Sequence, residues 1–188
     1  MLCMRILKIT ILIFKICLFG NISSADSISW LEVLDQPKFN VIFLRHALAP
    51  GYGDPSEFDI SDCKTQRNLN QEGRDQAISI GTRLKMEGVL FEKIYSSEWC
   101  RCIETATLMD IGEITMFSGL NSYFQDHYDK KETLRKLMQK LEHLDEKNRM
   151  LMVTHQVVIS SVTGINVGSG VAVAYSTTDG SAIKISMP

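Results

Sequence analysis

The chain has almost no net charge, no repeat and no long uninterrupted apolar run, and each absence excludes a class of protein. Its 188 residues include 20 Lys and Arg against 22 Asp and Glu, a formal net charge of -2, so no basic surface for nucleic acid is expected. Hydrophobic residues make up 45% and charged residues 22%, which excludes intrinsic disorder. The length suits one globular domain, whose partners must be inferred from local sites.

The N-terminal residues differ from the rest of the chain, but they lack the length of a membrane span. Their apolar run, residues 9–19, is shorter than the ~20 residues that a span needs, and Lys15 interrupts it. Basic residues precede the run, and the small residues SSA end at Ala25, as in a secretory signal. We predict a signal peptide over 1–25 and a mature domain over 26–188, periplasmic or secreted, without stable membrane insertion. An uncleaved membrane anchor is the alternative.

Metal-site and cysteine-phosphatase motifs are absent as well. No pair of cysteines or histidines has a spacing such as CxxC or HxxxH, and no cysteine is followed six residues later by arginine. We therefore expect no metal and no cofactor. Three cysteines follow the signal segment: Cys63, Cys100 and Cys102. An oxidising compartment would favour one disulfide from Cys63 to either of the others, and three buried thiols are the alternative.

The hydrophobic pattern alternates between strands and helices. Two stretches with a continuous apolar run, FNVIFLRH at 39–46 and NRMLMVTH at 148–155, are typical of central strands covered on both faces. Further strands are expected at 93–97 and 113–117, helices at 69–88, 98–112, 129–147 and 156–164, and a hairpin around Asp179 and Gly180. This order predicts an α/β fold with three layers, in which a mostly parallel central sheet has helices on both faces and a C-terminal β-hairpin.

Both central strands end in a histidine, His46 and His155. Because the carboxyl ends of parallel strands meet at one edge of a sheet, we expect both imidazoles in one crevice. Arg45 precedes His46, and Arg101 lies in the first turn of the helix after the 93–97 strand. Arginine binds phosphate oxygens with two donors, and neutral imidazole is a nucleophile for phosphoryl transfer. His46 is the predicted nucleophile, and Arg45, Arg101 and a protonated His155 are expected to bind the phosphate.

The loop over 49–68 contributes two further candidates, because a loop this long in a compact domain is usually functional. Asp54 lies among its Gly and Pro residues and is a candidate for substrate contact. Arg67 either binds the phosphate or the rest of the substrate, or it caps the following helix or pairs with a surface acid.

Four motifs together resemble a known family. LRHA at 44–47, LNQEGRDQA at 69–77, SSEWCRCIETA at 96–106 and VTHQ at 153–156 follow the order of the histidine phosphatase superfamily, in the branch shared with phosphoglycerate mutases. The resemblance implies a phosphoglycerate mutase-like fold, a phosphohistidine intermediate on the first histidine and a small-molecule phosphomonoester substrate, with phosphorylated sugars among the candidates. The long loop resembles that of the superfamily's small secreted bacterial phosphatases.

The general acid departs from the family pattern. Many members place a glutamate between the second helix and the late histidine, and others place an aspartate directly after that histidine, where this chain has Gln156. The available carboxylates are Asp54, Glu98, Asp126 and Asp129, and we take Asp126 as the candidate acid. Without a carboxylate in reach, substrates with good leaving groups, such as phosphohistidine on a protein, would be favoured. A non-catalytic protein that binds a phosphorylated ligand is the remaining alternative.

Overall fold

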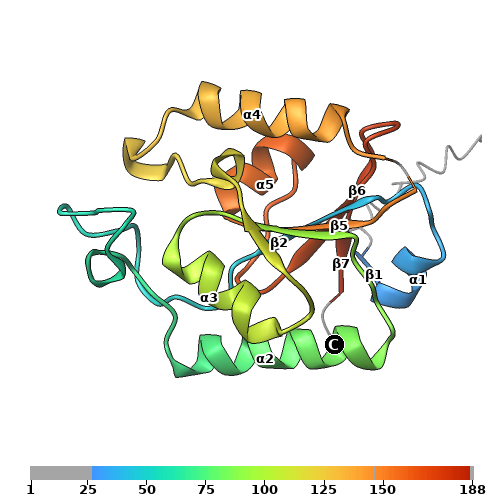
Figure 1. Ribbon diagram of the computed structural model, residues 1–188, viewed down its shortest axis with the longest axis horizontal. Helices are drawn as coiled ribbons and strands as arrows, with labels where there is room; N and C mark the ends of the chain where they lie inside the picture. The colour runs from blue at the N-terminus through green and yellow to red at the C-terminus, as the bar shows by residue number, and fades with distance from the viewer. Residues whose placement is uncertain (1–26, 146, 187–188) are drawn as a thin grey trace, which may run out of the picture.

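A seven-stranded sheet in the order β1-β7-β6-β2-β5-β3-β4 forms the centre of the molecule (Figure 1). The computed structural model describes residues 27–145 and 147–186, so the predicted signal peptide lies outside the described residues. The strands are β1 (Ser27–Ile28), β2 (Val41–Arg45), β3 (Lys93–Ser96), β4 (Ile114–Met116), β5 (Met150–Thr154), β6 (Ala172–Tyr175) and β7 (Ala182–Ile185).

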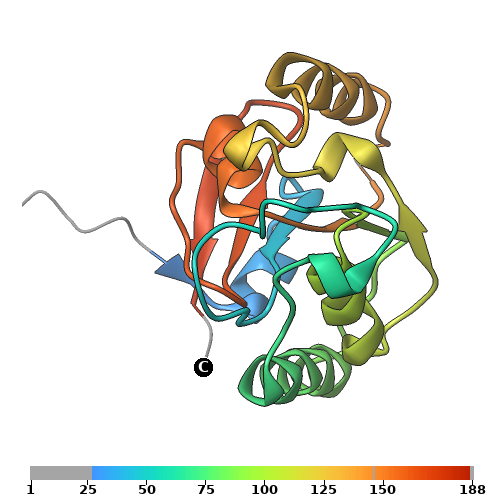
Figure 2. The same cartoon turned by 90° about the vertical axis from the view of Figure 1, so that its left-hand side faces the viewer.

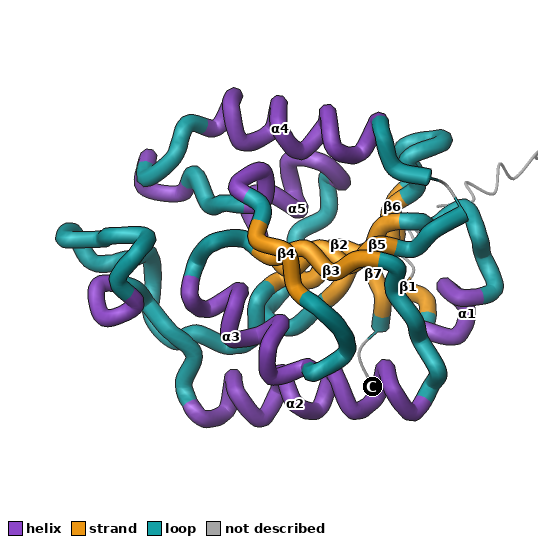
Figure 3. Tube along the Cα trace, viewed as in Figure 1, coloured by secondary structure: helices purple, strands orange, loops and turns teal. Residues whose placement is uncertain are grey.

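Helices cover both faces of this sheet, as the continuous apolar strands predict. The helices are α1 (Trp30–Leu34), α2 (Gln71–Met86), α3 (Cys100–Met109), α4 (Lys130–Glu142) and α5 (Gln156–Thr163). α1, α2 and α3 lie on one side of the sheet, and α4 and α5 lie on the other (Figures 1, 2 and 3). None of the helices in the described part of the chain is both long enough and apolar enough to cross a bilayer.

The side chains of β2 show how the two apolar faces form. Ile42 and Leu44 pack in the cluster that holds Leu84 of α2, whereas Val41 and Phe43 pack in the cluster that holds Leu137 of α4. Alternate residues of a strand point to opposite faces of a sheet. A strand between two helical layers must therefore be apolar at every position.

The strand pairing confirms the predicted fold class. β2 pairs in parallel with β5, β5 with β3, β3 with β4 and β1 with β7, whereas β6 is antiparallel to both β2 and β7. The antiparallel β6 and β7 form the expected C-terminal hairpin, closed by a hydrogen bond from the Ser176 amide to the Ser181 carbonyl. The sheet is therefore mostly parallel, with its antiparallel pairs at the C-terminal end of the chain.

Three local expectations were wrong or incomplete. α3 ends at Met109 rather than near Gly112, because Asp110 adopts the left-handed conformation with a φ of 50°. The amphipathic pattern of the predicted 129–147 helix places Met138 on its apolar face, yet Met138 is 41% exposed, while Leu137 and Leu141 are buried. β1 and α1 were not predicted, although Ser29 and Glu32 form a capping box at the start of α1.

A disulfide joins Cys63 to Cys100 across a sequence separation of 37, and it resolves the pairing that the sequence left open. Cys63 lies in the long loop and Cys100 is the first residue of α3. Cys102 is a free thiol buried in the apolar core beneath α3. The disulfide therefore ties the long loop to the helix that begins one residue before Arg101.

We expect the Cys63→Ser, Cys100→Ser double variant to lose about 4 kcal/mol of unfolding free energy, because the cross-link restricts the unfolded chain. Urea unfolding of wild type and variant, each with and without dithiothreitol, measures this. Reductant should destabilise the wild type to the level of the variant and leave the variant unchanged. Equal stability of oxidised wild type and double variant would contradict the expectation.

Candidate active site

The carboxyl ends of β2, β3 and β5 converge on one pocket of about 330 Å³. This is the edge of a parallel sheet where ligands generally bind. His46, His155, Arg45, Arg67 and Arg101 all line the pocket. The remaining lining residues are Gly51, Tyr52, Gly53, Ser122, Phe124, Gln156 and Val157.

His46 follows the last residue of β2, and its imidazole is held by its own backbone neighbour. Its Nδ1 lies 2.8 Å from the carbonyl oxygen of Ala47, and the residue is only 2% exposed. Burial first, and then the nearby charge of Arg101, lowers the pKa of His46 well below its usual value. The ring is therefore neutral at pH 7. A carbonyl can only accept a hydrogen bond, so the proton is on Nδ1 and the lone pair is on Nε2.

His155 lies beside His46, with 5.4 Å between the ring centroids. The expected convergence of the two histidines is therefore observed, because β2 and β5 are parallel neighbours. Burial first, and then Arg101, lowers the pKa of His155 well below its usual value. Both causes favour the neutral imidazole over the protonated state that the sequence predicts for His155.

Arg45 and Arg67 bring two guanidinium groups to the pocket from different segments. Nη1 of Arg45 donates to the carbonyl oxygen of Val167 at 2.8 Å and to Oε1 of Gln156 at 3.2 Å. Nε of Arg67 donates to the carbonyl oxygen of Gly53 at 2.7 Å, and its Nη1 donates to that of Ala49. Of the alternatives for Arg67, the structure places it at the pocket.

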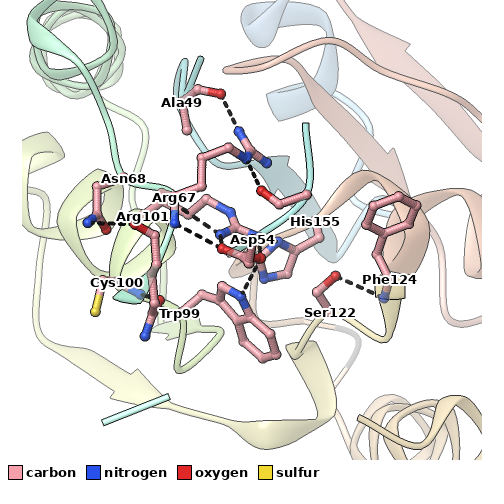
Figure 4. Close-up of polar contacts among 12 residues, drawn as sticks. Ala49, Asp54, Arg67, Asn68, Trp99, Cys100, Arg101, Ser122, Phe124 and His155 are labelled. Carbon is pink, nitrogen blue, oxygen red and sulfur yellow. Dashed lines mark hydrogen bonds and ion pairs between the residues drawn. The ribbon is translucent and has the colours of Figure 1, made fainter. Parts of the chain in front are cut away.

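Asp54 does not line the pocket, contrary to the expectation of substrate contact, but binds Arg101 from the side. Its Oδ1 accepts from Nη1 of Arg101 at 2.7 Å and its Oδ2 from Nη2 at 3.1 Å (Figure 4). The Arg67 amide and the Trp99 indole also donate to this carboxylate, at 3.0 and 3.2 Å. The two side chains of the ion pair are 3% and 4% exposed. Asp54 therefore orients Arg101 and balances its charge.

No carboxylate among the described residues lines the pocket, and this corrects the choice of Asp126 as general acid. Asp126 is exposed and has a φ of 59° in a short turn outside the pocket. Asp129 caps α4 by accepting from the Glu132 amide at 2.7 Å, and Glu98 accepts from Nδ2 of Asn121 at 2.6 Å. The described residues also hold no cluster of three metal-ligating side chains.

An aromatic pair at the pocket mouth was missed by the sequence analysis. Tyr52 is 87% exposed, and its ring lies edge to face with Phe124 at 5.1 Å between centroids. Gly51 and Gly53, both at positive φ, flank Tyr52, and a bond from the Asp54 amide to Oε1 of Gln125 at 2.7 Å joins the two segments. The GYG triplet was the available signal for this turn.

The family comparison covers the part of the chain that holds most of this site. Residues 41–121 match the model of the histidine phosphatase superfamily (branch 1). These residues, somewhat less than half of the chain, are similar to this superfamily. The matched residues include Arg45, His46 and Arg101, whereas His155 lies beyond them and is connected to the site by its position beside His46.

Several solved structures resemble the chain at low sequence identity. The protein histidine phosphatase SixA complexed with tungstate has a TM-score of 0.52 at 16% identity, over 77% of this chain and 92% of its own. The phosphoserine phosphatase of Entamoeba histolytica, in complex with 3-phosphoglyceric acid, has a TM-score of 0.55 at 14% identity, over 78% of this chain and 94% of its own. TTHB049 of Thermus thermophilus has a TM-score of 0.54 at 15% identity, over 78% of this chain and 99% of its own. These likenesses show the fold, and no curated protein matches the chain.

We expect Asp54→Asn to cost about 3 kcal/mol or more of unfolding free energy at pH 7, because it leaves the buried Arg101 charge uncompensated. Burial alone raises the pKa of Asp54, but the hydrogen bonds and charge of Arg101 outweigh it and hold the pKa below its usual value. The stabilisation is therefore complete above about pH 4 and is lost as the pH falls through the lowered pKa.

Urea unfolding of wild type and Asp54→Asn between pH 7 and about pH 3 checks both statements. The difference between the two proteins should shrink toward the acid end. Asp75→Asn, which changes an exposed carboxylate on α2, is the matched control and should have little effect. A difference that does not depend on pH would show that the charge of Asp54 is not what stabilises the protein.

Proposed function

We propose that this protein is a metal-independent phosphatase that hydrolyses its substrate through a phosphohistidine on Nε2 of His46. The observation that carries the proposal is the hydrogen bond from Nδ1 of His46 to the Ala47 carbonyl at 2.8 Å. It leaves the lone pair of a neutral, buried imidazole on Nε2, in a pocket lined by cationic side chains. A neutral imidazole with a defined lone pair is the form required of a nucleophile.

The charge of the pocket suits a phosphate dianion. Arg45, Arg67 and Arg101 contribute three positive charges, and Asp54 offsets one of them. Burial first, and then repulsion from Arg101, lowers the pKa of both Arg45 and Arg67, yet guanidinium stays protonated at any working pH. The Nε–H groups of Arg45 and Arg101 are buried without a partner among the described residues. Phosphate oxygens are acceptors that would satisfy such donors.

Both chemical steps balance without a metal ion. In the first, the lone pair on Nε2 of His46 forms a bond to phosphorus, and the bond to the leaving group breaks with its electron pair. The proton on Nδ1 stays in place, so the product is a phosphorylated imidazolium. In the second, water attacks phosphorus, the P–N bond returns its electron pair to Nε2, and both protons of the water leave on dihydrogen phosphate. The arginines stabilise the charge on the transferred group.

The leaving group distinguishes between two classes of substrate. A phosphomonoester releases an alkoxide or phenoxide, which normally needs a proton from a general acid. No carboxylate among the described residues lines the pocket to supply it. A phosphohistidine side chain whose other ring nitrogen is protonated leaves as a neutral imidazole and needs no acid. This favours phosphohistidine as a second candidate substrate, in line with the name of the structural neighbour SixA.

We also propose that the mature protein acts in the periplasm or outside the cell. The Cys63–Cys100 disulfide supports this location, because disulfides persist in oxidising compartments.

We expect wild type incubated with a labelled phosphate donor, then quenched in alkali, to carry label that is stable to base and released by acid. His46→Ala should carry none and should lose phosphatase activity by about 10³-fold or more, because the nucleophile is gone. His143→Ala, which changes an exposed histidine after α4, is the matched control and should keep both. Label that survives His46→Ala, or full turnover by that variant, would overturn the mechanism.

The pocket also predicts a steep dependence on the leaving group. We expect kcat/KM for an alkyl phosphate to be about 10²–10⁴-fold below that for p-nitrophenyl phosphate, the range that a general acid usually contributes. Steady-state rates for both esters and for a phosphohistidine peptide measure this. Asp126→Asn should leave all three rates unchanged. Similar rates for the two esters, or a loss confined to the alkyl ester in Asp126→Asn, would show that an acid operates.

A further inference from the structure

We propose that Ser97, Asn121 and Glu98 form a hydrogen-bond relay that holds a proton on Nε2 of His155 and keeps Nδ1 on the phosphate side. These three residues link the end of β3 and the start of α3 to the segment that follows β4. The proposal rests on the proposed phosphatase function for its effect on rate. Its structural content, the position of one proton, can be measured without any reaction.

The first step is the orientation of the Asn121 amide. The backbone N–H of Glu98 donates to Oδ1 of Asn121 at 2.9 Å, and Nδ2 of Asn121 donates to the Glu98 carboxylate at 2.6 Å. A backbone N–H can only donate and an ionised carboxylate can only accept. Glu98 therefore fixes which end of this buried amide is oxygen, and Oδ1 is available only as an acceptor.

The acceptor on Asn121 fixes the direction in which the Ser97 hydroxyl donates its proton. Its Oγ lies 3.1 Å from Oδ1 of Asn121, so the hydroxyl proton must be donated to that oxygen. The Trp99 amide donates to the same Oγ at 3.3 Å, and Nε2 of His155 lies 3.0 Å from it. Because the hydroxyl has already used its only proton, Oγ can only accept from His155. The neutral imidazole therefore carries its proton on Nε2.

The third step places the lone pair of His155. Nδ1 lies 3.5 Å from Nη2 of Arg101, which lines the pocket, so the unprotonated nitrogen is on the phosphate side of the ring. Burial is the largest cause that lowers the pKa of this ring, and Arg101, His46, Arg67 and Arg45 lower it further. The Cys102 thiol is 3.5 Å from Nε2, but burial raises its pKa to about 12, so it stays neutral.

In this relay Glu98 acts on His155 through Asn121 and Ser97, and it is not the general acid. Its carboxylate lies at the far end of these hydrogen bonds from His155. It supplies the negative charge of the relay, which stabilises a proton on His155. Ser97 is the critical link, because its hydroxyl contacts both Asn121 and His155. All three are positioning residues for His155 and do not line the pocket.

Long-range ¹H–¹⁵N correlation spectra of the ¹⁵N-labelled full protein test this directly. In wild type, His155 should show the neutral tautomer protonated on Nε2. Ser97→Ala should give a mixture of tautomers and reduce kcat by about 10-fold or more, whereas Ser97→Thr, which retains the hydroxyl, should restore both. Glu98→Gln should keep the tautomer, because its amide oxygen can still accept from Asn121, and should move the pH profile of kcat to lower pH.

Ser96→Ala is the matched control and should leave tautomer and kcat unchanged. It removes a neighbouring buried hydroxyl, which donates to the Ser97 carbonyl and not to the Ser97 side chain. Protonation on Nδ1 in the wild type would overturn the proposal even if no variant folded. An unchanged tautomer in Ser97→Ala would overturn it too. Label that survives His46→Ala, with the expected tautomer of His155 observed, would instead remove the proposed function and leave the relay standing.

Discussion

The parallel pairing of β2 with β5 is the interaction on which the rest of the site depends. Arg45 is opposite Thr154 in this register, and the His46 amide continues the ladder by donating to the Thr154 carbonyl at 2.9 Å. Both strands therefore end at the same level, and the residues that follow them are the two histidines. A slip of one residue would turn the apolar side chains of β2 to the opposite faces of the sheet. The packing of two helical layers thus fixes the distance between the imidazoles.

Compensation of buried charge is the second constraint. Arg101 and Asp54 are almost fully buried as a pair, and unpaired burial of either would be costly. Arg45 and Arg67 bind backbone carbonyls and keep their full charge toward the pocket. The resting site therefore holds surplus positive charge around two neutral histidines. An anion would relieve that surplus, which supports the proposed binding of a phosphate group and the proposed attack on it by His46.

Much of the fold was predictable because its signals are local. The apolar runs of β2 and β5, the helix expected at 69–88 and the Asp179–Gly180 turn each depend on neighbouring residues, and the structure has all of them. The errors arose where distant contacts decide. Asp54 looked like a substrate ligand because it lies in a functional loop, but the fold brings it to Arg101, which is 47 residues away. Glu98 looked like an acid, but Asn121, 23 residues away, binds its carboxylate.

The sequence by itself determined the alternation of strands and helices, the two histidines at the strand ends and the family motifs around them. Those features depend on the periodicity of the side chains and on the spacing of residues that are close in the sequence, and folding does not change either. Tertiary structure alone decided that Cys63 pairs with Cys100, that Arg67 faces the pocket and that no carboxylate of the described residues does. It also supplies the contacts from which we infer the tautomers of His46 and His155, because a tautomer depends on which donors and acceptors surround a ring. Those partners come from segments far apart in the chain, and only folding brings them within hydrogen-bond distance.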